Sequence, residues 1–236
     1  MPMVMGMGIL QNLKQRKAER AFTDASAAYS AAYAQWKAEE DKVDEMLTIV
    51  RDCMEGRTHE QFVDMTDHGF MLDADEFPIA FLQGAAYLEI VKAPSQYSGG
   101  YGGVSFPLFG GVRMNTGGMK GNITTGAESI SVTDEGHAMV TNKRIMFTGA
   151  VRTHEWKFAK LMNMTHAPLG YTVFASSGSG KPAGIGYGEG PATEVQFRLE
   201  LAAAMARNTL AKYFDELTVE KQKHSSEAPV PPAPVA

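Results

Sequence analysis

Residues 136–161 read GHAMVTNKRIMFTGAVRTHEWKFAKL and contain three short apolar runs. Two short apolar runs, 138–141 and 144–148, flank the pair Asn142-Lys143. Asn accepts the positive φ of a tight two-residue turn, so this pair predicts a hairpin. A third run, 155–161, places charged residues between large apolar ones, as in a half-buried strand, but loses this alternation after Phe158. The stretch therefore predicts three consecutive antiparallel strands, a meander around which the rest of the chain is organised.

The β pattern extends to both sides of this meander, from about residue 77 onward. Gly and Pro separate short apolar runs that we expect to be strands, at 87–91, 104–108, 111–114, 129–133, 171–176 and 184–187. Pro191 then suits the first turn of a helix, which we expect to continue to about Phe214.

The N-terminal part has a helical pattern instead. Residues 9–55 contain neither Gly nor Pro, and Gly56 is well placed to end a helix. Large apolar residues recur every seven positions, which favours one long helix with a coiled-coil face. This candidate helix interface consists of Phe22, Tyr29, Trp36, Val43 and Val50. Because propensity alone rarely stabilises such a helix, we expect it to dimerise or to pack on the C-terminal helix; docking of a different protein is the alternative.

These patterns predict four segments. Residues 1–56 form the long helix, a possible coiled coil, and residues 57–76 form an acidic connector. Residues 77–215 form the β-domain with its C-terminal helix, and residues 216–236 are the helix end and a Pro/Ala-rich tail expected to be disordered.

Composition limits the classes of function. The net charge of −5 combines an acidic part, residues 1–76 with 8 basic and 15 acidic side chains, with a mildly basic β-domain, residues 77–215 with 12 and 9. A general nucleic-acid binder would carry a denser basic face, so we expect no nucleic-acid partner. A single cysteine, Cys53, excludes an intrachain disulfide and suits a cytoplasmic protein. The first twenty residues combine apolar and basic side chains, which leaves open a peripheral contact with an anionic membrane.

The sequence contains no catalytic, cofactor-binding or metal-binding motif. Residues 175–182 come nearest to a phosphate loop, but they lack its first Gly and place Pro182 where Ser or Thr would hold magnesium. The six histidines have no metal-ligand spacing, and we expect them on the surface or at strand edges. Acidic neighbours on the helix would raise the pKa of Cys53, which makes it a poor nucleophile. We therefore expect a protein that is not an enzyme and has no cofactor.

The remaining candidate site is a surface. Five basic residues on the hairpin and the neighbouring strands could converge into an anionic-ligand surface, or they could be ordinary solvated strand positions. They are Lys143, Arg144, Arg152, Lys157 and Lys160.

Two motifs carry a resemblance to a known family. Gly-x-x-x-Val-Thr-Asn-x-Arg-Ile-x-Phe at 136–147 and Thr-x-Glu-Trp-x-Phe-x-Lys-Leu at 153–161 resemble the meander of bacterial PH-like and GRAM-like domains. The chain is especially similar to uncharacterised actinobacterial and phage proteins that join a long N-terminal helix to such a domain. The resemblance implies an α+β fold: a long helix, then a PH-like antiparallel β-barrel or sandwich of about seven strands capped by a C-terminal helix.

The same resemblance implies binding and no catalytic residues. We expect a non-enzymatic binding or adaptor protein that recognises a protein or a ligand through its PH-like domain, with a protein partner or self-association through the N-terminal helix. The alternative is a peripheral membrane binder that recognises anionic lipid through a basic face of the β-domain.

Overall fold

A computed structural model describes residues 5–57, 62, 69–92, 105–107, 113–115, 128–178 and 181–234. The glycine-rich loop and turn expected within residues 95–103 and 116–122 lie outside these ranges. The chain divides into two compact units, which we call the helical unit (residues 1–45 and 219–236) and the sheet unit (residues 46–218). Helix α1 (Met5–Met54) contributes to both units, and so does helix α3 (Leu210–Ser226).

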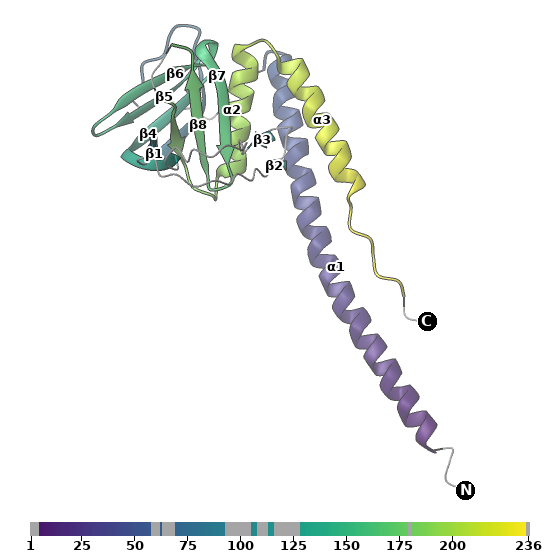
Figure 1. Ribbon diagram of the computed structural model, residues 1–236. Coiled ribbons are helices and arrows are strands. Elements are labelled where there is room, and N and C mark those ends of the chain that lie inside the picture. Colours follow the sequence, from purple (N-terminus) through teal and green to yellow (C-terminus); the bar gives the residue numbers. More distant parts are fainter. Residues whose placement is uncertain are drawn as a thin grey trace, which may run out of the picture. The chain divides into compact units, whose positions relative to one another are not determined.

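The sheet unit contains a seven-stranded antiparallel sheet with the order β6-β5-β4-β1-β9-β8-β7 (Figure 1). Its strands are β1 (Pro78–Lys92), β4 (Glu128–Thr141), β5 (Arg144–Gly149), β6 (Thr153–Lys157), β7 (Leu161–Ala167), β8 (Tyr171–Ser176) and β9 (Ala183–Gly186). A separate two-stranded ladder joins β2 (Ser105–Pro107) to β3 (Arg113–Asn115). The predicted meander is confirmed as β4, β5 and β6, and the α+β fold with about seven antiparallel strands is confirmed with it.

Asn142 forms the β4–β5 turn for a different reason from the one that the sequence suggested. Among the described non-glycine residues, Asn208 alone has a positive φ, so Asn142 does not use the left-handed region. Its side-chain oxygen instead accepts a hydrogen bond from the Phe77 amide (3.0 Å), and its amide donates to the Asp75 carbonyl (3.1 Å). Asn142 therefore ties the hairpin to the segment that precedes β1.

Other boundaries also differ from the prediction. Gly136 does not start a strand; it lies within the fourteen-residue β4 and pairs with Gly149 of β5, and a Cβ there would lie 2.1 Å from the Thr148 carbonyl oxygen. The third strand of the meander ends at Lys157, because residues 158–160 form a 3-10 helix before β7. The predicted C-terminal helix is two helices, α2 (Ala192–Ala206) and α3, separated by a turn in which Asn208 has a φ of 56°.

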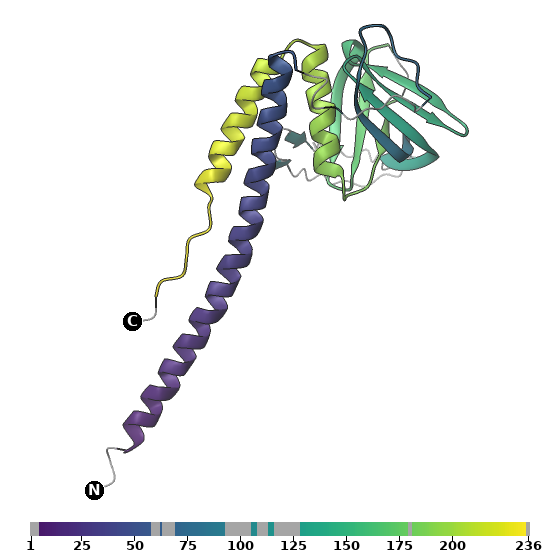
Figure 2. The same ribbon diagram turned by 180° about the vertical axis from the view of Figure 1, so that it is seen from behind.

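The core lies between one face of the sheet and α2 (Figures 1 and 2). Trp156 and Phe158 are buried as their alternation predicts, and the Trp156 ring lies 4.9 Å from that of Phe174. Helix α2 contributes Val195 and Leu199 to the same cluster. Burial of such side chains, at about 25 cal/mol per Å² of apolar surface, is the main term that stabilises the unit.

The turn between β5 and β6 is organised by one carboxylate. Asp134 accepts hydrogen bonds from the amides of Glu135 (2.9 Å), Val151 (2.9 Å) and Arg152 (2.7 Å). Burial opposes ionisation of Asp134, but these amide donors outweigh it and lower its pKa. Gly149 leaves room for this arrangement, because a Cβ there would lie 2.4 Å from Asp134 Oδ2.

The helical unit is built by α1 and the end of α3. The Trp36 ring stacks on His224 at 5.5 Å. The Nε1 of Trp36 donates to the His224 carbonyl and the Nε2 of His224 donates to the Trp36 carbonyl, both at 3.0 Å. Ser225 donates to Glu40 at 3.0 Å, and Lys221 pairs with Asp44. The two helices therefore run antiparallel and pack on each other. None of the helices in the described part of the chain combines the length and apolar character needed to cross a bilayer.

Candidate functional site

An open pocket of about 300 Å³ lies beside the β4–β5 turn, and we call it the hairpin pocket. It is bounded by the turn, by β6, by the segment before β1, and by one residue each from the 3-10 helix and the end of α2. Its lining residues are Asp73, Asn142, Lys143, Arg144, Glu155, Lys157, Ala159 and Ala206. Three of the five predicted basic residues, Lys143, Arg144 and Lys157, therefore meet at one place.

Arg144 forms the inner wall of the pocket through a buried ion pair. Its Nε and Nη2 donate to the two carboxylate oxygens of Glu76, each at 2.8 Å, and the Glu76 side chain has no exposed surface. Thr141 Oγ1 and the Asp73 amide donate to the same carboxylate, at 2.6 and 3.0 Å. Burial alone would raise the pKa of Glu76, but these donors outweigh it and lower the pKa. Arg144 therefore fixes the segment before β1, and its guanidinium is largely used within the chain.

Lys143 is the more accessible cation of the turn. Its ammonium group forms ion pairs with Asp75 and with Asp73, the latter at 3.6 Å. The hydrogen bond from Lys143 lowers the pKa of Asp75, and the same contact raises the pKa of Lys143. Both groups therefore keep their charge over a wide range around neutral pH.

The outer wall comes from β6. Glu155 lies 3.3 Å from the ammonium of Lys157 and 3.4 Å from Nη1 of Arg144. Lys157 retains a side chain that is 56% exposed. Positive and negative groups thus alternate around the pocket, and it is not a uniformly basic surface.

The other two predicted basic residues lie elsewhere. Arg152 pairs with Glu89 at 2.9 Å, and its guanidinium lies 5.4 Å from the centre of the Tyr87 ring. Lys160 is exposed at the end of the 3-10 helix, outside the pocket lining. The five candidates therefore do not form one surface.

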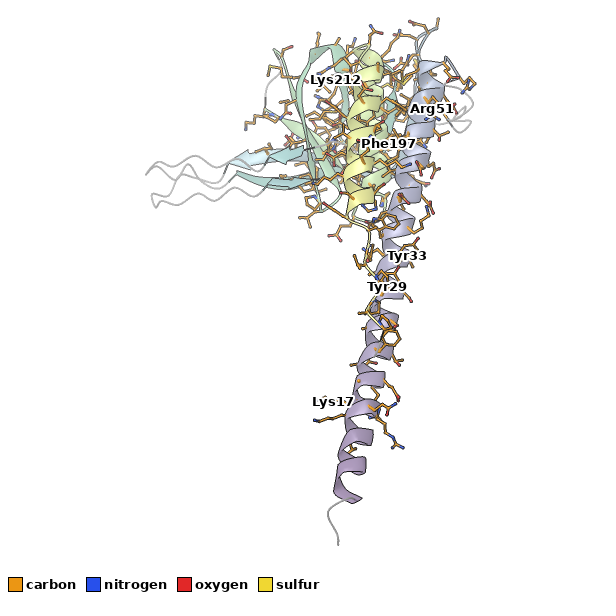
Figure 3. All side chains as sticks on the ribbon, turned by 90° about the vertical axis from the view of Figure 1, so that its right-hand side faces the viewer. Lys17, Tyr29, Tyr33, Arg51, Phe197 and Lys212 are labelled. Carbon is orange, nitrogen blue, oxygen red and sulfur yellow. The ribbon has the colours of Figure 1, made fainter. Side chains whose placement is uncertain are left out.

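The candidate helix interface is also divided. Val43 and Val50 have no exposed surface, so the chain itself covers this part of the predicted face. Phe22 and Tyr29 are half-buried, and Trp36 is contacted by α3. Figure 3 shows Tyr29 next to Tyr33 on α1, and their rings are 5.9 Å apart. Only the part of the interface that precedes Trp36 is available to another molecule.

His166 is not at the surface, because it is 1% exposed; it lies in β7, an edge strand of the sheet. Its Nε2 is 2.8 Å from Glu200 Oε1, and its Nδ1 is 2.8 Å from the hydroxyl of Thr172. That hydroxyl also lies 2.8 Å from the phenol of Tyr187. The hydrogen-bonded series of Glu200 carboxylate, His166 imidazole and Thr172 hydroxyl has the composition of a hydrolytic triad. Thr172 is fully buried, however, and cannot reach a substrate. The network therefore satisfies buried polar groups between the sheet and α2.

Two further observations concern groups that often take part in catalysis. Cys53 is buried, and this burial raises its pKa to about 11, so the thiol is protonated at neutral pH. No group of three His, Cys, Asp or Glu side chains that could hold a metal ion occurs in the described part of the chain. Sequence reasoning missed the carboxylates of the hairpin pocket, because Asp73 and Glu76 precede their cationic partners by about seventy residues.

A scan against protein-family models and searches of curated proteins and of solved structures find no match to this chain.

Proposed function

We propose that the protein is a non-enzymatic binding or adaptor protein whose sheet unit is a PH-like domain that recognises another protein through the hairpin pocket. The meander topology supports the PH-like assignment: the first strand β1 pairs with the last strand β9, and α2 covers one face. A cytoplasmic location is part of this proposal, and a single buried thiol is compatible with it.

The observation that carries the proposal is the internal pairing of charges around the pocket. Lys143, Arg144 and Lys157 each lie within 4 Å of a carboxylate of the same chain. Neighbouring carboxylates raise the pKa of Lys143 and of Arg144, so these two groups stay charged and suit electrostatic recognition, whereas proton transfer at neutral pH needs a group that titrates there. An anionic membrane attracts a dense, uncompensated basic surface, and the pocket offers alternating charges instead. The pocket therefore fits a protein segment with groups of both signs better than it fits a lipid headgroup.

Binding to anionic lipid is the alternative. Two charge-reversal variants of the full chain separate the two functions. The pocket variant combines Lys143→Glu with Lys157→Glu. The matched control combines Lys181→Glu with Lys212→Glu, which are exposed positions of the same unit. We expect the pocket variant alone to lose proteins that the wild type captures from a native lysate. Co-sedimentation with phosphatidylserine vesicles that fades with salt and is lost in the pocket variant would favour the lipid function instead.

The exposed part of α1 supports a second role, self-association or docking of a protein partner. Between Leu13 and Gln35 no described side chain is buried, and the side chains of Thr23, Ser30 and Gln35 form hydrogen bonds within the helix itself. A helical stretch of this length rarely persists in water without tertiary contacts. Light scattering on the wild type and on Phe22→Glu with Tyr29→Glu tests this role: a dimer that becomes a monomer supports self-association, and a monomer in both cases excludes it.

A further inference from the structure

Strand β6 lies at one edge of the seven-stranded sheet (Figure 1). In the part of the chain that the structure describes, it pairs with β5 on one side and with no strand on the other. An edge strand presents backbone donors and acceptors that an added strand can use.

The register shows which backbone groups of β6 are available. The Phe158 amide donates to the Lys143 carbonyl at 3.0 Å, and the Gly149 amide donates to the Arg152 carbonyl at 2.8 Å. In an antiparallel ladder, hydrogen-bonded pairs alternate with non-bonded pairs. The even-numbered residues from 152 to 158 therefore bond to β5, and the odd-numbered residues direct their N–H and C=O groups away from it. The open edge consists of the backbone groups of Thr153, Glu155 and Lys157.

The side chains of these three residues are exposed, whereas Trp156 is buried and His154 is half-buried. Glu155 and Lys157 also line the hairpin pocket. The free backbone edge and the pocket are therefore adjacent, which provides the two parts of strand-addition recognition: main-chain hydrogen bonds for affinity and a pocket for side-chain choice.

We propose that β6 binds an extended segment of a partner protein as an added strand, and that this segment carries one acidic and one basic side chain two residues apart. Glu155 and Lys157 are opposite charges at that same spacing, and opposite charges on facing strands attract. The acidic side chain lies towards Lys157 and Lys143, and the basic one lies towards Glu155. The inference rests on the proposed function and specifies the partner of that site.

A second copy of the chain fits this edge less well than a peptide segment does. Strand β6 has five residues, and a stable protein–protein interface buries about 800 Å² on each partner, far more than five residues of one edge provide.

The test uses the full chain and a random twelve-residue peptide library displayed on phage. We expect the enriched peptides to share an acidic and a basic residue two positions apart. Glu155→Pro removes the outward amide without touching a bond to β5, because Pro is tolerated where an edge N–H faces solvent. Glu155→Ala is its matched control, since both variants lose the carboxylate. We expect a selected peptide to bind Glu155→Pro at least about tenfold more weakly than Glu155→Ala.

Amide hydrogen exchange of the wild type gives a second measurement that does not depend on the folding of Glu155→Pro. With saturating selected peptide, we expect the amides of Thr153, Glu155 and Lys157 to become protected, while those of His154 and Trp156 change little. Two results would overturn binding as an added strand and leave the proposed function standing. In the first, peptides bind through Lys143 but do not change the amide protection of β6. In the second, they bind both Glu155 variants equally. Failure to enrich any peptide would contradict both. Protection without peptide, with a doubled mass in light scattering, would assign the edge to a second copy.

Discussion

Removal of the Arg144 guanidinium tests how the hairpin pocket is held together. Arg144→Ala leaves the buried Glu76 carboxylate with the Thr141 hydroxyl and the Asp73 amide as its remaining donors. Loss of one partner of a buried ion pair costs about 3–5 kcal/mol, and because two donors remain we expect a loss of about 3 kcal/mol in the free energy of unfolding. Lys157→Ala is the control: its pair with Glu155 is solvent-exposed, and such pairs contribute less than about 1 kcal/mol.

Urea unfolding followed by tryptophan fluorescence measures both losses. A Trp36→Phe background leaves Trp156, which is buried in the core of the sheet unit, as the reporter of that unit. We also expect Glu76→Gln combined with Arg144→Met to be less destabilised than Arg144→Ala, because no buried charge then remains unpaired. Equal, small losses for Arg144→Ala and Lys157→Ala would refute the structural role of the Glu76–Arg144 pair.

Three further outcomes follow from the same contacts. Gly149→Ala should lower the free energy of unfolding by about 2 kcal/mol, because the added Cβ would clash with the Asp134 carboxylate, whose position is fixed by three amide donors. A loss below about 0.5 kcal/mol would contradict this. The pKa values of Glu76 and Asp134 are lower in the folded state than in the unfolded state, where they are about 4. The stabilisation from these two carboxylates is therefore complete above about pH 4 and is lost as the pH falls further. The melting temperature should drop below about pH 4, and the Glu76→Gln variant should show a weaker drop. Cys53 should react with a thiol reagent at pH 8 far more slowly than an unfolded control, and a rate equal to that of the unfolded chain would contradict its burial.

The sequence predicted the parts of the fold that depend on local pattern. Alternation placed Trp156 and Phe158 in the core, and the heptad pattern placed a long helix before the sheet. It could not predict the break at Asn208, because the flanking residues 205–211 include neither Gly nor Pro and remain compatible with a helix. The sequence also predicted two strands, 129–133 and 138–141, where the structure has the single strand β4, because a glycine such as Gly136 is typical of a turn. In the structure, Gly136 instead allows the close approach of Thr148.

The candidate site was predicted in part. The position of Lys143 and Arg144 at a hairpin follows from local sequence, and so does their proximity to Lys157 on the next strand. The pairing of Arg144 with Glu76 could not be predicted, because Glu76 is 68 residues away and no local pattern encodes that contact. The burial of His166 could not be predicted for the same reason: its partners Thr172 and Glu200 come from another strand and from α2.

Site-specific photo-crosslinking in cells shows whether another protein binds at the hairpin pocket. A photo-reactive benzoyl-phenylalanine replaces Lys157 in one sample and Lys212 in another, because both side chains are exposed positions of the sheet unit. If another protein binds at the hairpin pocket, we expect a discrete adduct with it from position 157 and none from position 212. Absence of an adduct at 157, or the same adducts from both positions, would contradict it.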